Sequence, residues 1–254
     1  MAIAHIIYRP AAQQNLTEIK FAEILMLKSS PRPAALLALL MTVVAANVGI
    51  FARLYGQGMG GQSLFILTRV WILVLPLFWA WRVDRQRLAP TWPTRKEWQV
   101  GWWLGLGMAG VIYGGYALIG QHWIDPEVTR SQAAAVGLLN PWIFAAFAVY
   151  FTFVNALVEE YIWRWFVYRK CEVLVPGIWA VMLAALCFTL HHIVSLFGFT
   201  ENWGITIWGS IGVFIAGAIW SGCYLRYQSL WVCYISHALA DLAIAIVAWQ
   251  ILFV

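Results

Sequence analysis

The stretch Ile178-Trp-Ala-Val-Met-Leu-Ala-Ala-Leu-Cys-Phe-Thr-Leu-His-His-Ile-Val-Ser-Leu-Phe-Gly198 decides the fold. It contains no Asp, Glu, Lys or Arg. Its length suits a transmembrane helix, which needs about 20 mostly apolar residues. The two adjacent histidines inside it, His191 and His192, are polar groups where a bilayer would surround them with hydrocarbon. Such groups are costly in a membrane and usually mark a functional site.

The rest of the chain repeats this pattern of long apolar stretches. Of its 254 residues, 63% are hydrophobic and only 11% are charged, whereas a soluble domain has about 25% charged residues. The 17 tryptophans suit the two membrane–water interfaces. The sequence therefore predicts an all-α fold, a polytopic transmembrane helix bundle of about seven spans. We expect these spans at residues 34–52, 64–81, 99–120, 142–166, 178–198, 205–225 and 229–252.

Short linkers join the expected spans, so residues 33–254 are expected to form a single transmembrane domain. Residues 1–32 would be a cytoplasmic or interfacial segment, in which 19–27 has the pattern of a short amphipathic surface helix. Polar residues interrupt this segment throughout, so no signal peptide is predicted.

Basic residues are concentrated on one side of the predicted membrane. With the N-terminus inside, 13 of the 16 Lys and Arg residues lie in inner segments. Arg53 and Arg130 lie in outer loops, and Arg69 lies near the outer end of span 64–81, where its side chain would snorkel to the interface. The N-terminus is therefore predicted to be cytoplasmic. A small, Trp-rich chain with no soluble domain would suit a prokaryotic enzyme, so we expect a prokaryotic inner membrane. This topology also accounts for the net charge of +5, so the lipid bilayer is the expected partner and nucleic acid is not.

Glycines in span 99–120 allow two interpretations. Gly105-Leu-Gly-Met-Ala-Gly110 fits a GxGxxG pattern, but no strand precedes it, so a dinucleotide site is not predicted. The pairs Gly101/Gly105 and Gly110/Gly114 are GxxxG motifs, which let helix backbones approach closely in a bilayer. We therefore expect both pairs to lie at helix contacts.

Polar residues in three separate spans are expected to reach one depth. Glu160 and His192 each lie 16 residues from Pro176, in the turn between two antiparallel helices, so both would lie near the middle of the membrane. His237 is eight residues into the last span, about 12 Å along its axis, and Asp241 is one helical turn further. The spacing predicts one buried chamber.

The residue types in this chamber suit hydrolysis. Glu160 and Arg164 are spaced i,i+4 and are expected to form an ion pair, which leaves Glu159 without a local partner. A carboxylate removed from water is a stronger base when it is ionised, so Glu159 could take a proton from water near His192.

The other two groups could assist that step. His237 could stabilise the tetrahedral intermediate, and Asp241 could orient His237, so that no Ser or Cys nucleophile is required. Two other interpretations stay open at this point. A buried Glu–Arg pair is often only structural, and transporters use buried Glu and His to carry protons.

The adjacent histidines point about 100° apart on a helix, so only one is expected to face the glutamates. Phe188 lies four residues before His192 and shares its face, where it would wall the chamber. We therefore predict that His192 is the functional histidine and that His191 packs between helices.

Three motifs occur in order along the second half of the chain. They are Glu159-Glu160-Tyr-Ile-Trp-Arg164, Phe188-Thr-Leu-His-His192 and His237-Ala-Leu-Ala-Asp241. Residues 149–245 thereby resemble the CAAX prenyl protease and bacteriocin-processing (CPBP, Abi) family of intramembrane endopeptidases, whose motifs are EExxxR, FxxxH and HxxxN. The first three spans carry no matching residue.

The resemblance implies an intramembrane endopeptidase that acts on a membrane-anchored protein or peptide, with its catalytic core at about 142–252. It assigns activation of water to Glu159 and His192, with Glu160 and Arg164 in the same motif. The motif-three pair, His237 and Asp241, would form the oxyanion site. A non-catalytic relative acting as an immunity or scaffold protein is the alternative function, beside a proton-coupled transporter.

Two points stay open within this resemblance. An ionised Asp241 cannot donate a hydrogen bond as the family's Asn can, so it is either protonated or only orients His237. The resemblance implies no cofactor, although Glu159, His192 and His237 could together supply a three-ligand zinc site.

Overall fold

The structure, a computed structural model, describes residues 31–56, 58–85 and 92–254. The surface helix expected at 19–27, and most of the expected N-terminal segment, lie outside these residues. Every regular element in the described part is a helix, and seven helices are long and apolar enough to cross a membrane. The predicted fold class and number of spans are confirmed. The spans are Arg32–Tyr55, Gly58–Arg82, Arg95–Trp123, Pro141–Leu174, Ile178–Thr200, Trp203–Tyr227 and Trp231–Phe253.

Five of these spans are essentially single helices, and two are composite. The single helices are α3 (Arg32–Tyr55), α4 (Gly58–Arg82), α11 (Ile178–Thr200), α12 (Trp203–Tyr227) and α13 (Trp231–Phe253). The third span joins α5 (Arg95–Gly115), the π-helical η2 (Tyr116–Gly120) and α6 (Gln121–Trp123). A short helix, α7 (Pro126–Ala135), follows it and was not predicted.

The fourth span alternates between α-helix and π-helix. It consists of α8 (Pro141–Val149), η3 (Tyr150–Asn155), α9 (Ala156–Glu160), η4 (Tyr161–Tyr168) and α10 (Arg169–Leu174). The short α9 segment, which ends in the two adjacent glutamates, thus lies between two π-helical segments. Such segments are rare and are frequent at functional sites.

Local sequence explains where several helices begin. Thr94 and Glu97 form a capping box at the start of α5, with Thr94 N donating to Glu97 Oε2 at 2.6 Å. Asn140 caps α8 and is followed by a proline at the first helical position. Gly177 has a φ of +56° immediately before α11, a conformation that costs glycine little. This turn reverses the chain, so that α11 returns antiparallel to the fourth span.

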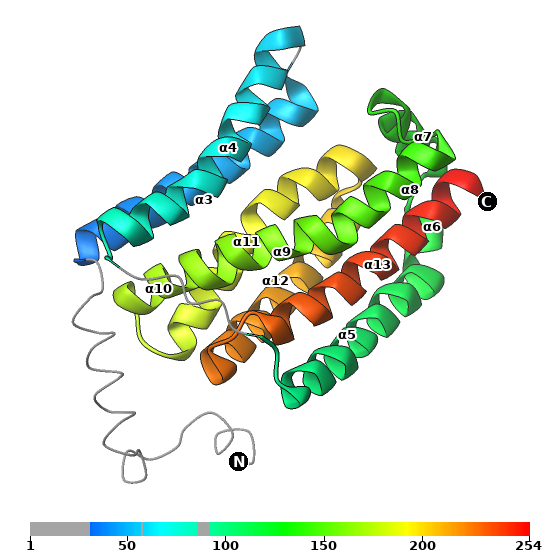
Figure 1. The fold of residues 1–254 in the computed structure, drawn as a ribbon. Helices are drawn as coiled ribbons and strands as arrows, with labels where there is room; N and C mark the ends of the chain where they lie inside the picture. Colours follow the sequence, from blue (N-terminus) through cyan, green and yellow to red (C-terminus); the bar gives the residue numbers. More distant parts are fainter. Residues whose placement is uncertain (1–30, 57, 86–91) are drawn as a thin grey trace.

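The helices form one bundle (Figure 1). The α3–α4 hairpin flanks one side, α5 packs against α13 on the opposite side, and the fourth span, α11 and α12 lie between them. Large apolar side chains such as Leu67, Val111 and Trp142 are exposed on the outside, as expected where lipid surrounds the protein. The charged residues Glu160 and Arg164 are instead 0% and 1% exposed.

Close contact between α5 and α13 uses only one of the two predicted glycine pairs. A Cβ atom on Gly101 would lie 2.9 Å from Ile235 Cβ, and one on Gly105 would lie 2.9 Å from Ser236 Cα. A Cβ atom on Gly110 or Gly114 would meet nothing within 4 Å. The packing role is therefore confirmed for Gly101 and Gly105, and it is wrong for the second pair.

This difference predicts opposite effects for the same substitution on one helix. Gly105→Ala is expected to destabilise the protein by about 1–3 kcal/mol, because overpacking forces the helices apart. Gly110→Ala is the matched control and should not lower stability, because open space receives its methyl group. Thermal unfolding of both variants in detergent would measure the effect. Equal melting temperatures for the two variants would contradict the prediction.

Arg69 lies in the first half of helix α4. The helix begins at Gly58, so Arg69 is 11 residues from its first residue and 13 from its last. Polar residues such as Gln62 and Ser63 extend the helix before the apolar stretch begins, so the location of Arg69 near the outer end of the apolar stretch stays a prediction.

Candidate active site

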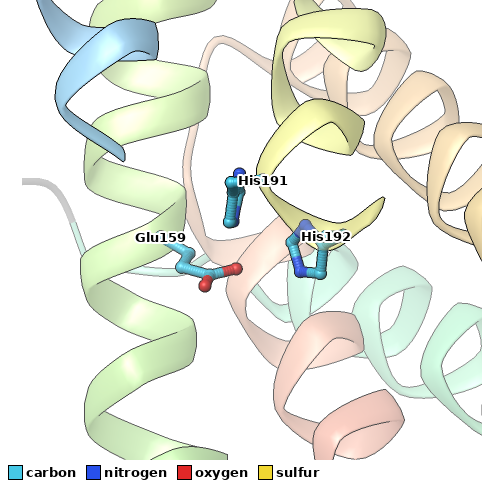
Figure 2. A group of neighbouring side chains, drawn as sticks. All are labelled: Glu159, His191 and His192. Atoms are coloured by element: carbon cyan, nitrogen blue, oxygen red, sulfur yellow. The ribbon is translucent and has the colours of Figure 1, made fainter. Parts of the chain in front are cut away.

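Three helices bring the motif residues together. Glu159 and Glu160 end α9, His192 lies on α11, and His237 and Asp241 lie on α13. Figure 2 shows the Glu159 carboxylate pointing from the fourth span toward the two adjacent histidines of α11. The hairpin and depth arguments from the sequence therefore predicted the right neighbours.

Glu159 occupies the centre of this group. Its Oε2 lies 3.7 Å from His237 Nε2, and its Oε1 accepts a hydrogen bond from Asn155 Nδ2 at 3.2 Å. One of its carboxylate oxygens and one ring nitrogen each from His191 and His192 lie within 4.8 Å of one another. The sequence analysis missed Asn155, although its i−4 spacing from Glu159 would have placed it on the same helix face.

Both histidines of α11 face Glu159. The expectation that only one of them would do so is wrong, since a ring nitrogen of each lies within 4.8 Å of a Glu159 oxygen. The two rings lie 4.1 Å apart between centroids and are tilted by 49°. Aromatic stacking holds the His191 ring against Trp163, with centroids 4.9 Å apart and planes at 5°. Because an imidazole ring is wide, ring nitrogens of two neighbouring histidines on a helix can both approach the same carboxylate, even though the two side chains leave the helix in different directions.

The backbone fixes the proton on His192. Its Nδ1 lies 2.9 Å from the carbonyl oxygen of Phe188. A carbonyl oxygen can only accept, so Nδ1 must carry the hydrogen, and in a neutral ring Nε2 then carries the lone pair. His192 therefore has one acceptor nitrogen left for the site. In contrast, Nδ1 of His191 is buried without a hydrogen-bond partner among the described residues.

Glu160 links two helices instead of facing the site. Its Oε1 lies 3.1 Å from Arg164 Nη1 and accepts a hydrogen bond from His237 Nδ1 at 2.7 Å. The predicted i,i+4 ion pair with Arg164 is present. The bond to His237 was not predicted, because spacing within one helix carries no information about contacts between helices.

Aromatic rings surround the Arg164 guanidinium. Its Cζ lies 4.4 Å from the Phe188 ring centroid and 4.9 Å from that of Trp220. Its nitrogens make no well-aligned hydrogen bond to the described residues, so the short distance to Glu160 is an electrostatic contact supplemented by cation–π attraction. Phe188 thus lies among the motif residues, beside Arg164 and His192.

Trp220 is a site residue that the sequence analysis missed. Its ring stacks on His237 with centroids 4.1 Å apart, and its Nε1 donates to Ser236 Oγ at 2.9 Å. With 17 tryptophans in the chain, composition offers no signal that would distinguish this one.

Each ring nitrogen of His237 lies close to a carboxylate oxygen. Nδ1 is 2.7 Å from Glu160 Oε1, and Nε2 is 3.5 Å from Asp241 Oδ1. The orienting role expected for Asp241 therefore falls more directly on Glu160, which makes the shorter contact. Asp241 is buried, and its Oδ2 has no hydrogen-bond partner among the described residues.

A metal ion would find a different ligand set from the one considered above. Glu159, His191 and His192 offer three ligand atoms within 4.8 Å of one another, a donor set that suits zinc. His237 is the less suitable third ligand, because Glu160 and Asp241 already face its two nitrogens.

Two surface grooves lie outside this group of residues. The larger, about 490 Å³, is lined by α3, by the start of α4 and by Val194 of α11. The other, about 440 Å³, lies between α11 and α12 near Trp179 and Phe214. Neither contains a motif residue.

Comparison with known proteins identifies the second half of the chain. Residues 140–243 match the family model described as type II CAAX prenyl endopeptidase Rce1-like. No curated protein and no solved structure matches the chain significantly. The matched segment holds all three motifs and excludes α3, α4 and α5. With seven helices that are long and apolar enough to cross a membrane, this is an integral membrane protein whose residues 140–243 match the Rce1-like, CPBP family of CAAX prenyl endopeptidases, as the motifs predicted.

Proposed function

We propose that this protein is an intramembrane endopeptidase that uses Glu159 and His192 to activate water and hydrolyse a peptide bond of a membrane-anchored protein or peptide. The observation that carries the proposal is the approach of a Glu159 oxygen and a His192 ring nitrogen within 4.8 Å. A water molecule bound between the two groups would donate one hydrogen to each, so that a lone pair of its oxygen faces the substrate.

In the proposed reaction, Glu159 takes a proton from this water as the oxygen adds to the scissile carbonyl carbon. We propose that His237 is protonated on both ring nitrogens between Glu160 and Asp241. Its Nδ1 then donates to Glu160, and its Nε2 hydrogen stabilises the negative charge on the former carbonyl oxygen. Glu159 returns its proton to the leaving nitrogen as the C–N bond breaks. The products are a carboxylate and an amine, and no covalent enzyme intermediate forms.

Zinc chemistry is the second candidate, favoured by the convergence of Glu159, His191 and His192. A bound zinc ion would supply a Lewis acid and an activated water. We expect instead that the purified protein keeps its activity after chelator treatment and that elemental analysis finds less than one zinc per chain. One tightly bound zinc per chain, lost together with activity, would favour the metal mechanism.

The two histidines provide an independent prediction. His192→Ala is expected to eliminate turnover, because it removes the acceptor nitrogen that the Phe188 carbonyl orients. His191→Ala should retain a substantial fraction of activity, since the main contact of its ring is stacking on Trp163. Rates of both purified variants on one substrate would measure this. Loss of activity in both would indicate that His191 is a ligand or a catalytic group, and the reverse pattern would contradict the assignment.

The function itself is tested by comparing protein termini in cells. Cells that carry the wild-type protein, cells that lack it and cells that carry Glu159→Gln are compared by mass spectrometry of protein N- and C-termini. New termini in membrane-associated proteins should appear only with the wild type. A scaffold or immunity protein would act equally well with Glu159→Gln, and a proton-coupled transporter would generate no new termini.

The distribution of basic residues supports a cytoplasmic N-terminus, and we infer that residues 1–32 lie on the inner side. We also propose that the membrane is a prokaryotic inner membrane. Residues 33–254 are proposed to act as one domain, with the catalytic core at 142–252.

A further inference from the structure

Helix α12 provides none of the motif residues, but it places a buried tryptophan against the candidate active site. Trp220 is 3% exposed, and its ring stacks on the His237 ring with centroids 4.1 Å apart and planes at 21°. Phe188 also meets the His237 ring, but its centroid is 6.2 Å away and its plane is inclined at 88°. The indole of Trp220 therefore lies flat on the imidazole, whereas Phe188 meets it edge to face.

Hydrogen bonds fix Trp220 relative to helix α13. Its Nε1 donates to Ser236 Oγ at 2.9 Å, and its carbonyl oxygen accepts a hydrogen bond from Cys233 Sγ at 3.2 Å. The Ser236 hydroxyl lies 2.8 Å from the carbonyl oxygen of Val232, so it can donate there while it accepts from the indole. Ser236 directly precedes His237. The edge of the indole is thus tied to the same turn of α13 whose imidazole is covered by its face.

The charges around Trp220 indicate what the indole face can contribute. Glu160 Oε1 lies 2.7 Å from His237 Nδ1 and 3.1 Å from Arg164 Nη1, so two cationic groups share this carboxylate in the proposed reaction. Arg164 Cζ is also 4.9 Å from the Trp220 ring centroid. The face of an indole attracts cations more strongly than the other aromatic side chains do. Trp220 is therefore placed to stabilise a positive charge on His237 that Glu160 must share with Arg164.

We propose that Trp220 is a positioning residue of the reaction, which holds the His237 ring with Nε2 toward the base and stabilises its positive charge. This inference rests on the proposed function. His237 Nε2 lies 3.7 Å from Glu159 Oε2, on the side where the proposed reaction forms the oxyanion. A flat surface against the imidazole restricts its rotation, and a fixed donor needs no reorganisation when the negative charge develops. The contact should therefore raise kcat and leave substrate binding unchanged.

The inference is tested by weakening the indole face while keeping its shape nearly constant. Tryptophan analogues with increasing numbers of ring fluorines are incorporated at Trp220 of the full-length protein in lipid vesicles. Fluorine withdraws electron density from the ring and weakens its attraction for cations. The probe is a quenched fluorescent peptide that spans the cleavage site found by the comparison of termini. Across the series, kcat should fall progressively by about 2- to 30-fold, and KM should stay unchanged.

Trp79 provides the matched control. It is a buried tryptophan of α4, outside the candidate active site, and the same fluorine series at Trp79 should leave kcat unchanged. A denaturant titration adds a readout that needs no turnover. Fluorination at Trp220 should raise the equilibrium constant of unfolding, and in a His237→Gln background the increase should be smaller by about 2- to 30-fold, because the cation on the indole face is gone.

A purely structural role for Trp220 would give different results. If the fluorine series lowers stability but leaves kcat unchanged, Trp220 acts through packing or through Arg164, and the proposal is overturned. An equal effect on unfolding with and without His237 would overturn it as well. No cleavage by the wild type, together with an unfolding effect that depends on His237, would sink the proposed function but not the contact. Cleavage by the wild type with no effect of fluorination on kcat would sink the role of Trp220 alone.

Discussion

Glu159→Gln is expected to lower kcat for peptide hydrolysis by about 10²–10⁴-fold, the usual contribution of a general base. The glutamine amide has almost the same shape as the carboxylate, but it cannot take a proton from water. Its carbonyl oxygen can still accept the hydrogen bond from Asn155, which the structure places at 3.2 Å from Glu159 Oε1. The variant should therefore fold like the wild type while its rate of hydrolysis falls.

The control for this experiment lies on the same span. Glu172→Gln makes the same chemical change on an exposed residue of α10, where the carboxylate accepts a hydrogen bond only from Tyr168 among the described residues. Activity and thermal unfolding of both variants are measured after reconstitution into vesicles. A Glu159→Gln protein with wild-type activity would end the assignment of Glu159 as the base. Loss of activity together with loss of folding would mean that the residue acts structurally.

Arg164→Met is expected to have the largest effect on stability. Glu160 is 0% and Arg164 is 1% exposed. Removing one partner of a buried ion pair leaves the other charge uncompensated, at a cost of about 3–5 kcal/mol. The hydrogen bond from His237 to Glu160 compensates only part of the lost charge. The free energy of unfolding should fall by this amount in a denaturant titration in mixed micelles.

A double variant separates the effect of charge on stability from the effect of side-chain packing. In Glu160→Gln/Arg164→Met no uncompensated charge remains, so it should be more stable than Arg164→Met alone. Arg226→Met, at the exposed end of α12, should unfold like the wild type. If the double variant is instead less stable than either single variant, the pair contributes through packing and cation–π contacts and not through charge neutralisation.

Distances along the chain could be predicted well from the sequence. Hydropathy identifies the spans because each must provide about 20 apolar residues, and all seven were found. Equal spacing of Glu160 and His192 from Pro176 predicted their common depth, because both flanking helices rise by the same amount per residue. The ion pair of Glu160 with Arg164 followed from i,i+4 spacing within one helix.

Rotation of helices about their axes could not be predicted in the same way. Which face of α13 meets α5 depends on packing across the whole bundle, so Gly105 and Gly110 look alike in the sequence but have different surroundings. The contact between Glu160 and His237 joins residues 77 positions apart, and no local pattern indicates it.

The π-helical segments on both sides of Glu159 and Glu160 also limit how the chain can change in length. A loop tolerates the gain or loss of a residue, whereas a single deletion in an α-helix rotates everything beyond it by about 100°. In the fourth span, the wider turns of η3 and η4 set the direction of the two glutamates relative to Arg164 on one side and Asn155 on the other. An insertion or deletion at either segment is therefore equivalent to moving the glutamates to another face of the helix. Protein engineers can vary the side chains of this helix, but they should treat its residue count as fixed.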